Sequence, residues 1–446
     1  MKKRWAIPLV IVACSLIGSN NLTLAAIQTG ITTRVSIASD GTQANNNSEE
    51  PSISADGRFV AFVSYADNLV SGDTNQVTDI FVRDRSMGQT ELVSKSSSGA
   101  LGNNYSYAPS ISADGRFVAF QSIASNLVSG DTYIGADIFI HDRLTGQTEL
   151  VSISSAGVQG DGDSYEPSIS ADGRFVAFES YADNLVSDDT VFWNVFIRDR
   201  GTGQTELISK SSEGEPGNEP SGEPSISADG RFVAFRSGAS NLVSGDANEW
   251  GDIFVYDRQT GQVELVSVAS NGAQGNNYPD KPSISADGRF VAFSSYASNL
   301  VIDDTNLVED VFVHDRQTRE TRRVSISSTG VQGDNWSERP VTSADGRFVA
   351  FMSDAHNLVS GDTNLDVDIY VHDLQTGQTE CVSVNRDGAQ GDGNSFDPSI
   401  SAAGRFVAFF GNSTNLVYGD TNGAQDVFVY DREGINYYLP LTQNQP

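Results

Sequence analysis

The amino-acid sequence predicts an all-β protein: a seven-bladed β-propeller of four-stranded antiparallel blades, closed by an N-terminal strand that completes the last blade. Two observations predict this fold. A phrase recurs at a constant spacing, and a segment before the first repeat matches the fourth strand pattern of each repeat. The phrase Ala-Asp-Gly-Arg-Phe-Val-Ala-Phe (with Ala403 for the aspartate of the seventh copy) places its glycine at intervals of 58, 58, 57, 58, 58 and 58 residues, at Gly57, Gly115, Gly173, Gly230, Gly288, Gly346 and Gly404. A strict period of this length is typical of propellers and solenoids.

Each repeat contains four short strand patterns, named A to D here. In the first repeat, Pro51–Ser54 predicts strand A, Arg58–Ser64 strand B, Asp79–Arg83 strand C and Thr90–Ser94 strand D. Strand B is apolar at both parities, which is expected of a strand covered on both faces by neighbouring blades. Four short antiparallel strands without helical periodicity indicate a propeller blade.

The two ends of the repeat region predict how the ring closes. Thr33–Ser36 precedes the first repeat, and Val35 lies 58 residues before Val93 of strand D. The seventh repeat ends soon after its strand C, so we expect this N-terminal segment to supply the missing strand D and to hide the free sheet edge. Tyr437–Leu439 is the alternative closing strand.

The chain divides into three regions. Residues 1–25 combine Lys2, Lys3 and Arg4 with a short apolar run and a small-residue site, which predicts a secretory signal peptide. Residues 31–432 form the propeller, and residues 433–446 form a C-terminal tail. The protein is therefore expected to be exported, to the periplasm, the cell surface or the medium. Ile11–Cys14 loosely resembles a lipidation site, a weaker alternative, and no later segment is apolar enough to span a membrane.

The composition excludes several classes of partner. The formal charge is −30, and loss of the three signal-peptide cations takes it to −33. Such a chain repels nucleic acids and anionic lipid surfaces and favours divalent cations, cationic partners or simple solubility. One mature cysteine, Cys381, excludes an intramolecular disulfide, and four histidines cannot build a repeated zinc site. We expect a monomer.

The repeat also resembles a known family. Pro-Ser-Ile-Ser-Ala-Asp-Gly-Arg-Phe-Val-Ala-Phe, followed by Asp-Ile-Phe-Val-x-Asp, is similar to the propeller repeat of TolB and related exported bacterial proteins. The resemblance covers essentially the whole mature chain and implies a protein-binding or scaffolding propeller. Seven copies depart from the six blades of TolB, and the separate N-terminal domain of TolB is absent, so a role in the Tol envelope system does not follow.

The loop between strands B and C is the main candidate for a metal site. It repeats Asn-Leu-Val-Ser-Gly-Asp-Thr-Asn, with a further aspartate at the start of strand C, and alternating oxygen ligands suit Ca²⁺. The candidate ligands are Asp362, Asn364, Asp366 and Asp368 in blade six, Asp73, Asn75 and Asp79 in blade one, Asp304, Asn306 and Asp310 in blade five, and Asp420, Asn422 and Asp426 in blade seven. The open alternative is that these side chains only brace their loops through local hydrogen bonds. No other cofactor is indicated.

Aromatic residues in the loop from strand D to the next strand A are candidates for ligand binding. They occur in two registers, Tyr105, Tyr278 and Trp336 in one and Tyr107, Tyr165 and Phe396 in the other. In propeller topology these loops share one face with the B–C loops. Exposed rings there stack on sugars or anchor a partner protein, or else pack against the rim of the next blade.

No catalytic motif is present, and the sequence predicts that the chain is not an enzyme. His141, His314 and His372 share a strand C position that other repeats fill with arginine or tyrosine, which predicts an exposed strand position. The most irregular stretches are Val191–Asn194 and Glu213–Glu223, which offer carboxylates but no catalytic constellation.

The leading functional hypothesis is an exported binding or scaffold protein that engages a partner protein or an envelope polymer through the B–C and D–A loops. A Ca²⁺-dependent glycan-binding module is the first alternative. A propeller hydrolase or lyase with a site at the central channel is the second.

Overall fold

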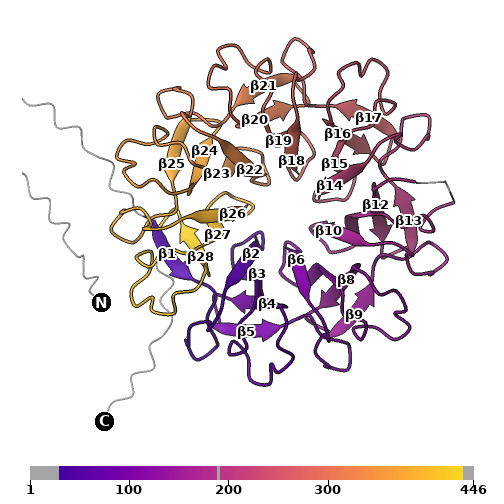
Figure 1. Ribbon diagram of the computed structural model, residues 1–446, viewed down its shortest axis with the longest axis vertical. Coiled ribbons are helices and arrows are strands. Elements are labelled where there is room, and N and C mark those ends of the chain that lie inside the picture. Colours follow the sequence, from indigo (N-terminus) through magenta and orange to yellow (C-terminus); the bar gives the residue numbers. More distant parts are fainter. Residues whose placement is uncertain (1–29, 188–190, 435–446) are drawn as a thin grey trace, which may run out of the picture.

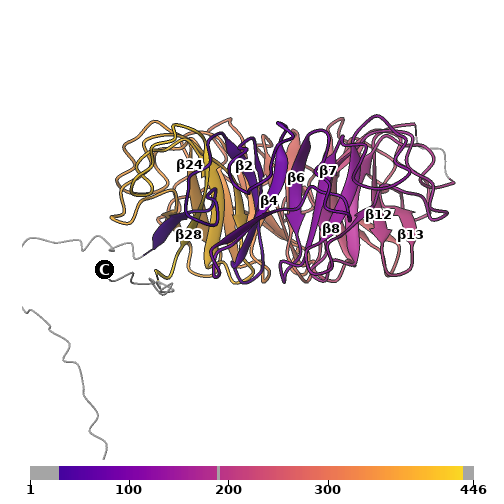
Figure 2. The ribbon, with the colours of Figure 1, turned by 90° about the horizontal axis from the view of Figure 1, so that it is seen from below.

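The computed structural model describes residues 30–187 and 191–434, which form seven four-stranded antiparallel sheets. The sheets are arranged as blades around a ring that is wider than it is thick (Figures 1 and 2). The predicted seven-bladed propeller is therefore confirmed. Within these described ranges, no helix is long and apolar enough to cross a membrane.

Strand A of each blade lies nearest the centre of the ring and strand D lies outermost (Figure 1). The A strands are β2 (Ser48–Ile53), β6 (Ser106–Ile111), β10 (Ser164–Ile169), β14 (Ser221–Ile226), β18 (Pro279–Ile284), β22 (Ser337–Thr342) and β26 (Ser395–Ile400). The B strands are β3 (Phe59–Ser64), β7 (Phe117–Ser122), β11 (Phe175–Ser180), β15 (Phe232–Ser237), β19 (Phe290–Ser295), β23 (Phe348–Ser353) and β27 (Phe406–Gly411). The C strands are β4 (Asp79–Asp84), β8 (Asp137–Asp142), β12 (Asn194–Asp199), β16 (Asp252–Asp257), β20 (Asp310–Asp315), β24 (Asp368–Asp373) and β28 (Asp426–Asp431). The D strands are β5 (Gln89–Leu92), β9 (Gln147–Leu150), β13 (Gln204–Leu207), β17 (Gln262–Leu265), β21 (Glu320–Arg323), β25 (Gln378–Cys381) and, in the seventh blade, β1 (Ile31–Arg34).

The N-terminal strand closes the ring, as the sequence predicts. β1 pairs antiparallel with β28, from Ile31 opposite Asp431 to Arg34 opposite Phe428. The strand lies two residues earlier than the predicted Thr33–Ser36. The alternative closing strand at Tyr437–Leu439 and the predicted signal peptide both lie outside the described residues.

Strand A begins three residues earlier than the sequence predicts. β2 starts at Ser48, and its register with β3 shifts between Glu49 and Ser52, which marks a β-bulge. Glu50 occupies this bulge with φ +51°, a left-handed conformation that accommodates the extra residue. The same conformation recurs on the other A strands at Ala108, Glu166, Glu223, Lys281, Arg339 and Asp397. Residues predicted as loop are therefore part of the innermost strand.

The hydrophobic core lies between the blades. Phe62 and Phe81 stack at 5.8 Å within blade one, and both are fully buried. One cluster joins Val63 of blade one to Val118 and Phe120 of blade two. Burial on both faces explains why strand B is apolar at both alternating sets of positions. Each buried aromatic side chain contributes about 1.5–3 kcal/mol to the stability of the fold.

The Asp-Gly-Arg turns, which join strand A to strand B, brace the end of each blade at which they lie. Arg231 donates from Nε and Nη2 to the two carboxylate oxygens of Asp257, at 2.8 and 2.7 Å. This bidentate pair holds the pKa of Asp257 at about 2. Equivalent pairs occur in the other blades, so this motif has a structural role in every blade.

Candidate functional site

The aspartate that starts strand C in every blade except blade three, where Asn194 takes its place, is buried and acts as a structural anchor. Asp79 is fully buried, and its Oδ1 accepts a hydrogen bond of 2.5 Å from Ser94 Oγ. Burial raises the pKa of Asp79 to about 6. The serine–aspartate bond recurs at Asp137, Asp252, Asp310, Asp368 and Asp426.

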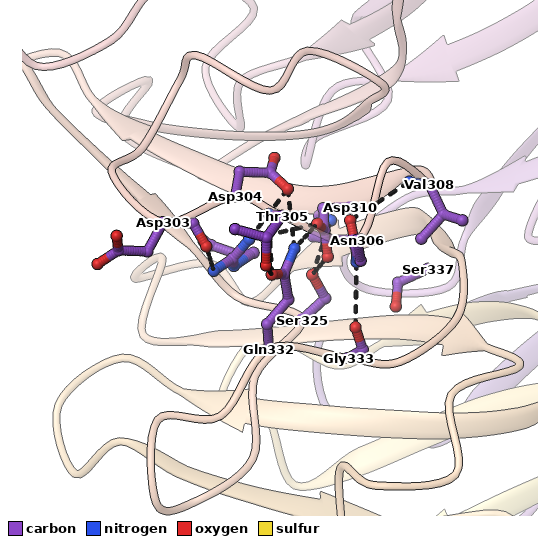
Figure 3. Close-up of polar contacts among 12 residues, drawn as sticks. Asp303, Asp304, Thr305, Asn306, Val308, Asp310, Ser325, Gln332, Gly333 and Ser337 are labelled. Carbon is purple, nitrogen blue, oxygen red and sulfur yellow. Dashed lines mark hydrogen bonds and ion pairs between the residues drawn. The ribbon is translucent and has the colours of Figure 1, made fainter.

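In the predicted metal sites of blades five and seven, nitrogen donors of the chain itself reach both carboxylates. In blade five, Gln332 Nε2 donates to Asp304 at 2.8 Å and to Asp310 at 2.9 Å (Figure 3). Arg323 Nη1 lies 3.4 Å from both of these carboxylates. Asn306 turns away from the pair and donates to the carbonyl of Gly333 (Figure 3). In this blade a cation of the protein itself stands between the carboxylates.

Blades one and seven also show internal bracing. In blade one, Asn75 Nδ2 donates to Asp79 Oδ2 at 2.7 Å, and Asp73 is partly buried nearby. In blade seven, Arg34 from the closing strand reaches both Asp420 and Asp426, at 3.1 and 3.5 Å, and Asn422 donates to Asp426 at 3.0 Å. The predicted carboxylate spacing is thus present, with nitrogen donors on its oxygens.

Blade six has a different arrangement. Tyr370, where other blades carry phenylalanine, donates from its hydroxyl to Asp362 Oδ2 at 2.6 Å. Asp362 Oδ1 and Asn364 Oδ1 are buried and accept no hydrogen bond. Both oxygens of Asp368 are occupied, by Ser383 and Gln390, and burial raises the pKa of its carboxyl to about 7. Asp366 is half-buried on the same loop.

No group of three or more histidine, cysteine, aspartate or glutamate side chains is positioned to hold a metal ion within residues 30–187 and 191–434. Blade six therefore offers one carboxylate oxygen and one amide oxygen with unused acceptor capacity, and calcium binding there stays a prediction.

The six predicted aromatic residues are spread around the ring and do not form one site. Most of them pack on a neighbour: Tyr105 on Tyr107, Tyr165 on Trp193, Tyr278 on Trp250 and Phe396 on Phe410, with ring centroids 6.2, 5.4, 4.5 and 5.5 Å apart. Trp336 and Phe396 are partly buried against the core of the blade-six region. Of the six, Tyr278 lines the cavity described next.

A cavity of about 590 Å³ opens beside blade four, on the face of the B–C and D–A loops. Three positions that carry larger side chains in neighbouring blades are glycine in blade four. They are Gly222 in place of Tyr107 and Tyr165, Gly238 in place of Tyr65, Tyr181 and Tyr296, and Gly251 in place of Trp193 and Glu309. All three glycines line the cavity, so the missing side chains create the space.

Two aromatic rings flank this blade-four cavity. Trp193 comes from the end of the B–C loop of blade three, and Tyr278 from the D–A loop that leads to blade five. Trp193 is held between Tyr165 and Tyr181, with centroids 5.4 and 5.6 Å away. Tyr278 is 46% exposed and rests edge-on against Trp250. Both rings are therefore fixed in place before a ligand arrives.

The charged lining of the cavity is predominantly negative. It contains five glutamates and two cations: Glu166, Glu179, Glu219, Glu223 and Glu249, with Arg236 and Lys281. Lys281 Nζ lies 3.2 Å from Glu223 and Arg236 Nε lies 3.8 Å from Asp280. Burial raises the pKa of Asp280, and the neighbouring Glu223 raises it further. Both cations are paired with carboxylates, so the exposed glutamates of the lining keep their negative charge and the cavity attracts positive groups.

Sequence reasoning found part of this site. Both irregular stretches contribute to it, through Trp193 and through Glu219 to Glu223. It missed Gly238, Arg236 and Lys281, which lie on regular strands or at their ends. The signal in the sequence is that the three glycines stand at repeat positions where the neighbouring blades carry larger side chains.

The three strand C histidines are buried, so the prediction of an exposed position is wrong. His141, His314 and His372 are 1%, 1% and 3% exposed. Each Nδ1 lies 2.9 Å from a strand D threonine hydroxyl, of Thr148, Thr321 or Thr379. Burial lowers the pKa of His141 to about 4. The outer strand and the adjoining blade cover a position that a lone hairpin would expose.

Comparison with known proteins defines the fold and not the family. No family model and no curated protein matches the sequence. Among solved structures, an oligogalacturonate lyase in complex with manganese aligns at 14% identity with a TM-score of 0.54, covering 90% of this chain and 92% of that one. An acylaminoacyl peptidase from Pyrococcus horikoshii aligns at 13% identity and 0.52, covering 87% of this chain and 52% of that one. A TolB from Agrobacterium tumefaciens aligns at 18% identity and 0.39, covering 66% and 83%.

These comparisons change two of the predictions. The resemblance to TolB is confirmed only as far as the propeller fold. The prediction that the chain is not an enzyme is contradicted, because the lyase and the peptidase are enzymes whose structures align over most of this propeller. The missing sequence motifs therefore cannot exclude catalysis on this fold.

Proposed function

We propose that this chain is an exported binding propeller that holds a basic group of a partner protein, or of an amine-bearing envelope polymer, in the blade-four cavity. The observation that carries the proposal is the set of three glycines that opens the cavity beside two fixed aromatic rings. On the face of the B–C and D–A loops, this cavity is formed by features of blade four that the neighbouring blades lack, which favours one anchored ligand over seven equivalent sites.

The chemistry of the lining favours a cation. Glutamates outnumber basic residues, and the formal charge of the chain is −30, so the surrounding field attracts positive groups. The rings of Trp193 and Tyr278 provide faces on which an ammonium or guanidinium group is stabilised by about 0.5–2 kcal/mol. The same faces pack against the carbon stem of a lysine or the ring of an amino sugar.

Filling the cavity tests the proposal. Gly238→Tyr restores the residue found in blades one, three and five, and the added Cβ would meet only ordinary contacts, 3.4 Å from Glu219 Cβ. We expect this variant to fold normally and to lose at least about 10-fold in affinity for tetralysine and for a glucosamine tetramer, measured by calorimetry. Acetylated forms of both probes should bind weakly to either protein.

Ile123→Tyr is the matched control, because it adds the same ring at the same repeat position of blade two. It should leave the affinity unchanged. Equal binding by the wild type and Gly238→Tyr, or no preference for free amines over acetylated probes, would contradict the proposal.

A Ca²⁺-dependent glycan-binding module is the second candidate, favoured by blade six. Asp362 Oδ1 and Asn364 Oδ1 are buried oxygens without a donor, which is the condition that a hard cation relieves. The neighbouring carboxylate of Asp366 would add a further oxygen, and that of Asp368 would join if the cation displaced Gln390 from its Oδ2.

Calcium binding predicts a higher melting temperature in Ca²⁺ than in EDTA. At a Ca²⁺ concentration 100 times the dissociation constant, the stabilisation is about 2.7 kcal/mol. Asp362→Ala with Asp368→Ala should remove the difference. Asp131→Ala in blade two, where Gln159 already donates to the carboxylate at 2.7 Å, should retain it. Identical melting in Ca²⁺ and EDTA would exclude this candidate.

A further inference from the structure

Neighbouring blades are joined by a repeated arginine contact on the face opposite the blade-four cavity. The arginine after strand C stacks on the first phenylalanine of the preceding blade and bonds to a strand D glutamate of that blade. Arg258 shows the arrangement: it lies 4.6 Å from the Phe175 ring centroid, 3.2 Å from Glu206 and 2.8 Å from the carbonyl of Gly230. Equivalent arginine–glutamate pairs are Arg143–Glu91, Arg200–Glu149, Arg316–Glu264 and Arg432–Glu380.

The interface between blades five and six lacks both partners of this contact. Leu374 stands where the arginine is expected, and Arg322 stands where the glutamate is expected. Leucine has no donor for the carbonyl of Gly346, whereas Arg258 bonds to the equivalent carbonyl of Gly230. The paired replacement removes the inter-blade ion pair and also reverses the sign of charge on strand D.

A cavity of about 390 Å³ occupies this interface. Phe290, Val313 and Leu374 form its apolar part, and its charged lining consists of Arg289, Arg322 and Arg347 with Asp315, Glu320 and Asp345. Arg289 and Arg347 are held in ion pairs with the strand C aspartates Asp315 and Asp373, which leaves Arg322 as the lining arginine outside those braces. Arg322 forms an ion pair with Glu320, at 2.6 Å, and their side chains are 56% and 47% exposed. An ion pair so exposed is weak, so an incoming carboxylate can displace Glu320.

The hairpin beside the cavity adds positive charge. Arg319 occupies the turn position that is glycine in the hairpins of blades one to four and six, and it adopts φ +63°. A non-glycine residue is strained in this conformation. Arg319 and Arg322 together give the outer strand of blade five a basic surface that the corresponding strands of other blades lack.

We infer that the interface of blades five and six binds an acidic peptide segment in which a carboxylate lies next to a large apolar side chain. The carboxylate pairs with Arg322, and Arg319 adds attraction from the hairpin. The apolar side chain fills the cavity against Phe290 and Leu374, in the space that an arginine side chain occupies at the other interfaces. This site lies on the opposite face from the blade-four cavity and does not depend on the function proposed for it.

Restoring the repeat tests this inference. The double variant Arg322→Glu with Leu374→Arg rebuilds the usual ion pair, so it should melt at the same or a higher temperature than the wild type while the cavity is filled. The probe is a panel of fluorescein-labelled peptides that place glutamate or aspartate next to leucine or phenylalanine, with glutamine and asparagine counterparts. We expect fluorescence anisotropy to show binding of an acidic peptide and a loss of at least about 10-fold in affinity in the double variant.

Two further variants keep the test decisive. Arg322→Gln changes an exposed side chain and should weaken binding even if the double variant fails to fold. Gly238→Tyr fills the cavity on the other face and should leave peptide binding intact. The inference is overturned if no acidic peptide in the panel binds the full chain at millimolar concentration, if the amide counterparts bind equally well, or if the folded double variant binds like the wild type.

Discussion

Arg34→Ala should destabilise the propeller by about 3–5 kcal/mol, because it leaves two buried carboxylates without their cation. Arg34 lies on the closing strand β1 and reaches Asp420 and Asp426, and the three side chains are 6%, 4% and 0% exposed. Its loss therefore weakens the last blade at the point where the ring is closed. Guanidinium-induced unfolding of wild type and variant would measure the difference.

The loss should depend on pH in a defined direction. Burial already raises the pKa of Asp420 and Asp426 in the wild type, and removal of Arg34 raises them further. A carboxyl with a raised pKa stabilises the fold when it is protonated, and that stability is lost as pH rises through the folded-state pKa. The variant should therefore lose less stability at pH 5 than at pH 8.

Two arginines of blade five serve as controls for Arg34. Arg323→Ala removes the same kind of buried guanidinium from blade five, whose four strands follow one another in the sequence. Any additional loss of unfolding free energy in Arg34→Ala therefore measures the contribution of ring closure. Arg322→Ala removes an exposed pair and should cost less than about 1 kcal/mol. A midpoint for Arg34→Ala as high as that for Arg322→Ala would show that Arg34 does not hold the closure.

Gly230→Ala should cost about 2–4 kcal/mol, because the new Cβ meets both backbone strain and a steric clash. Gly230 sits in the Asp-Gly-Arg turn with φ +73°, and a Cβ there would lie 2.2 Å from Phe175 Cδ2 of the preceding blade. Phe175 is itself fixed by the inter-blade contact with Arg258. The ring cannot move without disturbing the joint between blades three and four. Thermal unfolding monitored by circular dichroism measures the loss.

Gly245→Ala separates the two effects. Gly245 also has a positive φ, of +97°, but no atom lies within 4 Å of its added Cβ. This variant pays for backbone strain alone, so it should lose less stability than Gly230→Ala. Equal losses of stability in the two variants would mean that the turn conformation, and not the contact between blades, is the reason that this motif requires glycine.

The sequence predicts the fold well because each blade repeats the same local rules. The period, the both-face apolar pattern of strand B and the position of Val35 relative to Val93 predict seven blades and the closing strand. Strand A was predicted too short, since the bulge at Glu50 places a non-glycine residue in a left-handed conformation that no local signal marks. The exposure of the strand C histidines was predicted wrongly, since it depends on burial by other strands.

The candidate sites depend on comparisons between blades. The B–C aspartates were found from their spacing, but Arg323 and Arg34, which stand between the carboxylate pairs of blades five and seven, come from strand D and the closing strand. The blade-four cavity combines three glycines with Trp193 and Tyr278 from the two neighbouring blades.

By itself, the sequence determined the number of blades and the strand order, because these follow from local patterns repeated at a constant spacing. Only the tertiary structure decided which carboxylates are already paired and where the ring is hollow. Those properties arise where loops from different blades meet, and burial there sets the cost of an unpaired charge or a missing side chain.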